Sequence, residues 1–231
     1  LATDTASTVD AIIDVIESKS TFVFDFDGVL ADSVGIKTWA FSELYQQYGE
    51  KIVSQVVTHH LRNGGMSRFD KFEYYHKNFL DINLTKECMQ ELCKSFSNLA
   101  MKAVIDSPEI GGANKFLEHY CINNKLSFVN SATPVDEIRE IVARRRMDKF
   151  FTSVYGSPHS KLDNLKNIFS RYNTSPEQTV FFGDSIADFD AAERAGCEFI
   201  GIGGDIEFDV DSIVSKSAKK YGLLVNFEKI I

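Results

Sequence analysis

The sequence is poor in cysteine, proline and tryptophan, and it has fewer basic than acidic residues. Among its 231 residues are four cysteines, four prolines and one tryptophan. The cysteines form no C-x-x-C pair and fit no zinc spacing, so we expect free thiols in a reducing compartment. Twenty-five lysines and arginines face 33 acids, a net charge of −8. Nonspecific nucleic-acid binding needs a basic surface, so this composition argues against a nucleic-acid partner.

Long apolar runs and secretion signals are also missing. No stretch is long and apolar enough to span a bilayer, and no signal peptide is visible. We therefore expect a cytoplasmic protein with no membrane partner, either a monomer or a weak homodimer. The chain begins with Leu1 rather than Met, which leaves open whether an N-terminal segment was removed.

Short apolar runs alternate with helical patterns along most of the chain. Runs typical of buried strands lie at residues 21–26, 126–130, 152–155, 179–182 and 197–200. Apolar residues at helical spacing lie at 8–17, 112–123, 134–146, 161–172 and 186–195. This alternation predicts the α/β class, with a doubly wound parallel sheet. In such sheets, ligands bind at the carboxyl ends of the strands.

The stretch between residues 36 and 105 interrupts this alternation. It shows helical patterns and few strand signals, with a clear breaker at Asn63-Gly64-Gly65. We therefore predict a small helical domain at 36–105, inserted after the first strand into a core formed by 1–35 and 106–231. The aromatic residues of this insertion are expected to form its own core.

Residues suited to one reaction follow four of the predicted strands. In chain order they are Asp25 and Asp27, Ser131 and Ala132, Lys161, and Asp184 and Asp188. The carboxyl ends of parallel strands meet at one edge of the sheet, so we expect these residues to converge. Together they offer carboxylates, a hydroxyl with neighbouring backbone N–H groups, and a lysine. Mg²⁺-assisted phosphoryl transfer uses this combination.

The carboxylates predict a magnesium site. Mg²⁺ prefers oxygen ligands in octahedral geometry, and Asp25 and Asp184 are its natural carboxylate ligands. Asp188 lies one helical turn beyond Asp184 and can reach the ion directly or through water. Asp27 completes the acidic set in which we expect Mg²⁺ as cofactor.

The same residues have separate catalytic roles in this prediction. An ionised Asp25 can attack phosphorus and form an aspartyl-phosphate. Asp27 would protonate the leaving alcohol and then deprotonate the attacking water. Lys161 would offset the repulsion between the Asp25 carboxylate and the phosphate dianion of the substrate. Ser131 and the N–H groups that follow it, beginning with Ala132, would hold phosphate oxygens.

These motifs resemble those of the haloacid dehalogenase-like (HAD) hydrolase superfamily. They are Asp25-Phe26-Asp27-Gly28-Val29, Ser131, Lys161 and Gly183-Asp184-Ser185-Ile186-Ala187-Asp188. The resemblance covers the whole chain. It implies a Rossmann-like core, and the insertion is similar to the helical cap of the subfamily that includes phosphoglycolate phosphatase and β-phosphoglucomutase.

Residue choices within the motifs narrow the function. Relatives that act on phosphate esters carry the second aspartate, here Asp27. Mutases that resemble β-phosphoglucomutase usually carry a histidine about ten residues later, where this chain has Lys37. The third motif is Ser160-Lys161 rather than the common Lys-Pro, and Lys166 is a weaker alternative to Lys161.

In the insertion, Arg62, Gly64, Gly65 and Arg68 form a basic, flexible stretch. In similar proteins a cap loop of this kind contributes substrate specificity, and we expect the same here. The alternative is a surface turn with solvated arginines.

The sequence thus predicts a Mg²⁺-dependent phosphatase of a small phosphorylated metabolite, acting through an aspartyl-phosphate. The first alternative is a phosphomutase acting on a sugar phosphate. A non-catalytic binding module on the same fold is disfavoured, because the set of catalytic residues is complete. The identity of the phosphate ester is left open.

Overall fold

A single parallel sheet organises the larger part of the molecule. The computed structural model describes residues 6–122, 125–203, 223–224 and 226–231. Within them the strands are β1 (Thr21–Phe24), β2 (Leu126–Pro134), β3 (Ser153–Ser157), β4 (Thr179–Gly183), β5 (Glu198–Ile202) and β6 (Leu223–Leu224). Their order is β3-β2-β1-β4-β5-β6, with parallel pairing throughout. The predicted doubly wound parallel sheet is confirmed.

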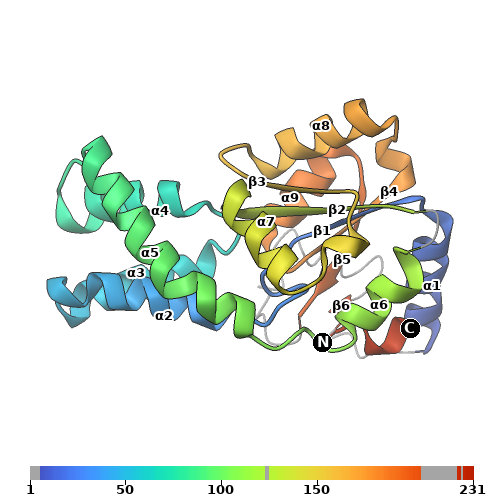
Figure 1. The fold of residues 1–231 in the computed structure, drawn as a ribbon, viewed down its shortest axis with the longest axis horizontal. Coiled ribbons are helices and arrows are strands. Elements are labelled where there is room, and N and C mark those ends of the chain that lie inside the picture. The colour runs from blue at the N-terminus through green and yellow to red at the C-terminus, as the bar shows by residue number, and fades with distance from the viewer. Residues whose placement is uncertain (1–5, 123–124, 204–222, 225) are drawn as a thin grey trace.

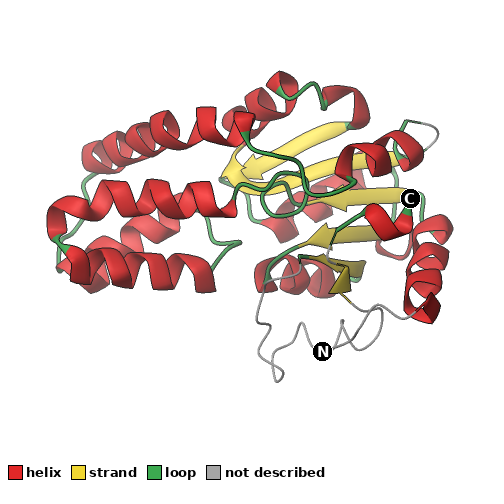
Figure 2. Ribbon diagram, turned by 90° about the horizontal axis from the view of Figure 1, so that it is seen from below, coloured by secondary structure: helices red, strands yellow, loops and turns green. Residues whose placement is uncertain are grey.

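Helices cover both faces of this sheet (Figures 1 and 2). One face packs against α1 (Ala6–Ser18), α6 (Ala113–Tyr120) and α7 (Val135–Arg144), and the other against α8 (Lys161–Tyr172) and α9 (Ile186–Ala195). Successive strand residues point to opposite faces, so Phe22 and Phe24 join the first core whereas Val23 joins the second. This two-sided burial explains why the strands read as continuous apolar runs.

A second group of helices lies beside the sheet, at the left in Figure 1, and we call residues 34–106 the helical insertion. It consists of α2 (Val34–Tyr45), α3 (Glu50–Arg62), α4 (Arg68–Tyr75) and α5 (Lys86–Asp106), with one π-helical turn at His76–Leu80. Its own core contains Phe41, Tyr45, Phe72, Tyr75 and Phe96. The predicted domain boundaries at 36 and 105 stay a prediction.

The two chain segments that join the insertion to the sheet run side by side. Ala31 and Glu109 form an antiparallel bridge, and the Asp32 N–H donates to the carbonyl of Pro108 over 2.9 Å. The Arg145 guanidinium donates to the carbonyls of Val104 and Ser107 at the end of α5. The end of α5 is therefore fixed to the sheet side of the molecule.

All four cysteines are free: Cys88, Cys93, Cys121 and Cys197. Among the described residues, no helix is long and apolar enough to cross a membrane.

The packing at the centre of the first core leads to a prediction about the free energy of unfolding. Phe182 is fully buried and stacks on Phe24 with 4.8 Å between ring centroids. We expect Phe182→Ala to lower the free energy of unfolding by about 3–5 kcal/mol, because it removes a buried ring and leaves a cavity beside Phe24. Urea denaturation measures this change. Phe69→Ala is the control, because Phe69 is 36% exposed; equal losses for both variants would contradict the prediction.

Candidate active site

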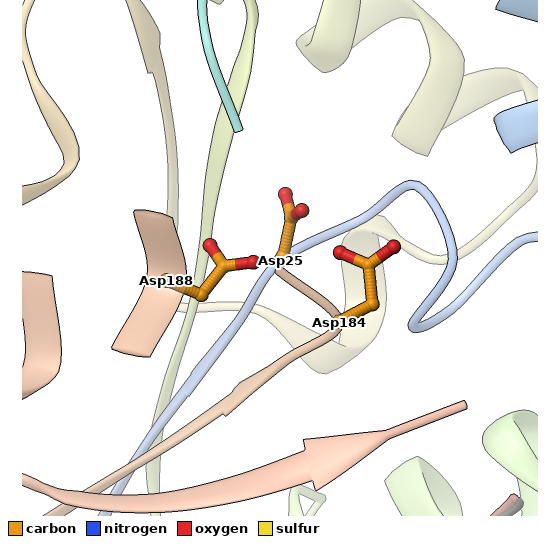
Figure 3. A group of neighbouring side chains, drawn as sticks. All are labelled: Asp25, Asp184 and Asp188. Carbon is orange, nitrogen blue, oxygen red and sulfur yellow. The ribbon is translucent and has the colours of Figure 1, made fainter. Parts of the chain in front are cut away.

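Three carboxylates meet at the carboxyl edge of the sheet. Asp25 follows β1, Asp184 follows β4, and Asp188 lies in the first turn of α9. One oxygen of each lies within 4.8 Å of the others, and Figure 3 shows the three side chains gathered at this edge. Asp25 and Asp188 are buried, and Asp184 is partly exposed. The structure thus brings together three of the four predicted metal-binding residues.

Local structure fixes the positions of Asp184 and Asp188. Ser185 begins α9 with a capping box, in which its N–H and hydroxyl donate to Asp188 Oδ2 over 3.1 and 2.6 Å. Gly28 has a φ of +79°, and a Cβ there would lie 2.2 Å from Asp184 Oδ2. Only glycine allows the loop after β1 to pass this close to the carboxylate.

Lys161 supplies the positive charge inside this cluster. It is 8% exposed, its Nζ lies 3.0 Å from Asp25 Oδ2, and it also pairs with Asp188 Oδ1. The Asn130 amide donates to the Lys161 carbonyl over 2.9 Å and so holds the start of α8. Lys166 is exposed farther along α8. Of the two lysines considered, Lys161 is the one that reaches the carboxylates.

The electrostatics of the cluster favour a bound cation. Burial, with the charges of Asp188 and Asp27, raises the pKa of Asp25 to about 7 even though Lys161 opposes the shift. Burial and the charges of Asp25 and Asp188 also raise the pKa of Asp184. The Asp25 Oδ1 atom is buried and has no hydrogen-bond partner among the described residues. Crowded carboxylate oxygens with an unsatisfied ligand atom fit a hard cation such as Mg²⁺.

Asp27 lies in a separate set of contacts. Its carboxylate pairs with Lys37 and accepts a hydrogen bond from Ser33 over 2.5 Å. Lys37 also donates to Thr133 over 2.9 Å. Burial would raise the pKa of Asp27, but Lys37 and the hydrogen bond from Ser33 lower it below its usual range. The carboxylate of Asp27 is thus engaged away from the other three.

The end of β2 supplies the remaining predicted groups. Ser131 is buried, and its hydroxyl accepts the Thr133 N–H over 3.1 Å. Ala132 and Thr133 line a cavity of about 30 Å³ between the sheet edge and the helical insertion. Thr133 and Lys71, which also lines this cavity, were not among the predicted site residues. Thr133 is recognisable only by its place two residues after Ser131, whereas Lys71 is hidden among the aromatic residues of α4.

The four predicted specificity residues have different surroundings. Gly65 lies against the start of α9, and a Cβ added to Gly65 would lie 2.4 Å from the Ala187 Cβ. Gly64 precedes it, and a Cβ there would lie 3.6 Å from the Ser185 Cβ. Arg68 is 7% exposed and forms a bidentate pair with Glu137, at 2.6 and 3.0 Å. Arg62 instead lines a separate hollow of about 290 Å³ formed by insertion residues.

Comparison with known proteins identifies related sequences. The family described as haloacid dehalogenase-like hydrolase matches residues 22–202. A phosphorylated carbohydrates phosphatase from Thermotoga maritima is 28% identical over 193 residues, which cover 77% of this chain and 82% of the relative.

Solved structures share the fold at lower identity. A predicted phosphoglycolate phosphatase from Haemophilus somnus superposes with a TM-score of 0.70 at 17% identity, covering 92% of this chain and 96% of that one. A β-phosphoglucomutase from Clostridium difficile gives a TM-score of 0.70 at 17% identity, covering 90% and 91%.

The raised pKa of Asp25 predicts that metal binding at this cluster would depend on pH. Below pH 7 the proton on Asp25 competes with the cation, so we expect Mg²⁺ binding at pH 6 to release about one proton or more, and fewer at pH 8.5. Calorimetric titration in buffers of different ionisation enthalpy measures this release. Asp25→Asn should reduce this proton release. Asp32 is an exposed neighbour, and Asp32→Asn should leave the proton release unchanged. Binding without pH-dependent proton release would contradict the assignment.

Proposed function

Because the chain belongs to the haloacid dehalogenase-like hydrolase family, we propose that it is a Mg²⁺-dependent phosphatase acting on a small phosphorylated metabolite through an aspartyl-phosphate. Family membership confirms the resemblance seen in the motifs and makes the chain a hydrolase. One observation carries the finer proposal. Asp25 presents a buried oxygen that has no hydrogen-bond partner in the described part of the chain, in a cluster with Asp184, Asp188 and Lys161.

Asp25 is the nucleophile in this proposal. Its carboxylate forms a bond to phosphorus while the bond from phosphorus to the ester oxygen breaks. Asp25 and Asp184 would hold Mg²⁺, which when bound would offset the repulsion between the carboxylate and the phosphate dianion. Both oxygens of Asp188 are already engaged by Lys161 and Ser185, so we assign it the positioning of Lys161 and contact with the ion through water.

Lys161 and the end of β2 are proposed to bind the transferred phosphate. Lys161 lies 3.0 Å from Asp25 Oδ2 and so remains beside phosphorus when the new bond forms. The backbone N–H of Ala132 and the hydroxyl of Ser131 would donate to phosphate oxygens, which are strong acceptors. Binding through these donors orients the phosphate for attack.

Asp27 is proposed to move the protons. Its low pKa keeps it ionised, the form that accepts a proton from the water attacking the aspartyl-phosphate. In the first step the leaving oxygen needs a proton, and Lys37, which donates to the Asp27 carboxylate, would supply it through Asp27. In the second step the proton that Asp27 takes from water would return to Lys37.

The helical insertion is proposed to act as the cap over this site. Gly65 packs on Ser185 and Ala187 at the start of α9, and the cavity beside Thr133 is lined by residues of both the insertion and β2. A closed cap excludes bulk water while the phosphoryl group is transferred. The cap must then open for product release.

A phosphomutase is the second candidate function. The solved β-phosphoglucomutase shares the fold, so an intermediate returned to a sugar phosphate rather than to water fits the same site. Lys37 argues against this alternative, because it occupies the region where the resembling mutases carry a histidine. The phosphatase relative named for phosphorylated carbohydrates keeps sugar phosphates among the candidate substrates.

The nucleophile and the cofactor can be tested together. We expect hydrolysis of p-nitrophenyl phosphate with Mg²⁺, none with EDTA, and a loss of about 10³-fold or more in kcat for Asp25→Asn. Asp32→Asn is the matched control on an exposed aspartate and should retain wild-type rates. Asp25→Asn with wild-type activity would refute the nucleophile. Isomerisation of a sugar phosphate without phosphate release would favour the mutase.

The proton-transfer role predicts a dependence on the leaving group. An alkoxide needs a proton in the transition state, whereas p-nitrophenolate leaves readily without one. We therefore expect Asp27→Asn to lower kcat/KM about 10²-fold or more for propyl phosphate, and less for p-nitrophenyl phosphate. Steady-state kinetics with both esters decides the matter. Equal losses on the two esters would remove Asp27 from proton transfer to the leaving group.

A further inference from the structure

Among the residues that the structure describes, Lys71 is a buried cation with no acidic partner. It lies in α4 with 2% of its surface exposed, and its Nζ is 2.8 Å from His60 Nδ1. Within the part of the chain that the structure describes, no carboxylate forms an ion pair with it. Lys37 and Arg68, the two other cations lining the same cavity, pair with Asp27 and Glu137. Lys71 therefore differs from its neighbours.

His60 does not neutralise this charge. Burial and the charge of Lys71 lower the pKa of His60 to about 3, so the imidazole is neutral near pH 7. Its Nδ1 then accepts from Lys71, while its buried Nε2 has no partner among the described residues. Burial, together with the charge of Lys37, lowers the pKa of Lys71 to about 7. An unpaired buried cation is costly unless an anion joins it.

The cavity places Lys71 on the leaving-group side of the proposed site. Lys71, Lys37, Ala132 and Thr133 line the same cavity. Lys37 and Thr133 both contact the Asp27 carboxylate, which would protonate the leaving oxygen. The half of the substrate that departs would thus lie between Asp27 and α4.

Arg68 is not available for the same task. Its guanidinium is held by both oxygens of Glu137 and donates to Ser97 over 2.8 Å, and it lies 4.6 Å from the centre of the Phe96 ring. These contacts connect the insertion to α7. The charge of Arg68 is therefore satisfied within the protein.

We propose that Lys71 is a specificity-determining residue that binds a second negatively charged group, a carboxylate or a phosphate, in the leaving half of the substrate. This inference rests on the proposed phosphatase function and names its substrate class. His60 is a positioning residue that orients the lysine. A neutral sugar would leave Lys71 without a counterion in the closed site.

Three esters with one three-carbon chain test the proposal: 3-phosphooxypropionate, propane-1,3-diol bisphosphate and propyl phosphate. We expect wild-type kcat/KM to be at least tenfold higher for one or both of the charged esters, and whichever is preferred identifies the anion. Equal rates for all three esters would overturn the proposal. Failure to hydrolyse even p-nitrophenyl phosphate would instead contradict the proposed function.

Substitution of the lysine separates recognition from folding. Lys71→Met should lower kcat/KM for the preferred charged ester roughly ten- to hundredfold, mainly through KM, and at least tenfold more than for propyl phosphate. Lys71→Arg should restore part of the preference. Lys77→Met, on an exposed lysine of the insertion, should change neither kcat/KM for the charged ester nor the preference over propyl phosphate. Glu137→Gln should affect all three esters by a similar factor.

A binding measurement covers the case in which turnover is absent or Lys71→Met is unstable. Calorimetry of 3-phosphooxypropionate and propane-1,3-diol bisphosphate with Asp25→Asn gives Kd without chemistry. Adding Lys71→Gln to this variant should weaken the tighter complex roughly ten- to hundredfold, with the melting temperature as a check on folding. Unchanged Kd, or equal losses for charged and neutral esters in the kinetic test, would overturn the proposal.

Discussion

The mutual repulsion of carboxylates at one edge of the sheet is the constraint on which the site depends. Asp25, Asp184 and Asp188 are close enough to share an ion, and Lys161 pairs with two of them, Asp25 and Asp188. Burial strengthens both the repulsion and the attraction, because few water molecules screen the charges. The protein therefore holds these acids in a state that a divalent cation would relieve, and Gly28, Asn130 and Ser185 help to keep them in place.

A second charge pattern surrounds this cluster and has a different purpose. Asp27 has Lys37, and Glu137 has Arg68, so each of these acids is already balanced. Balanced pairs connect elements that are distant in sequence: Arg68 belongs to the insertion, and Glu137 belongs to α7. Pairing within the protein positions groups, whereas an unpaired charge is left for a ligand. This difference distinguishes Lys71 from Arg68, although both are buried cations on one helix.

The sequence predicted the fold and the edge of the sheet that carries the site, because strand periodicity and the residues after each strand are local signals. Asp25, Asp184 and Asp188 were expected together and lie together. The surroundings of the insertion residues were not predictable in the same way. The sequence shows Arg62 and Arg68 as equivalent cations flanking two glycines, but the partner of Arg68 is 69 residues away on another helix. Lys71 stands in an aromatic stretch where helical periodicity predicts core, so its charge gave no local signal.

The paired connections between sheet and insertion have a mechanical consequence. Two connecting segments bridged at Ala31 and Glu109 resist sliding past each other and twisting more than they resist bending together about the bridge. The insertion is thus joined to the sheet domain by two adjacent chain segments. In the proposed opening of the insertion, the contact of Gly65 with the start of α9 and the ion pair of Arg68 with Glu137 would break together. The two contacts would then be coupled by the movement of the insertion as one body, without a continuous path of side chains between them.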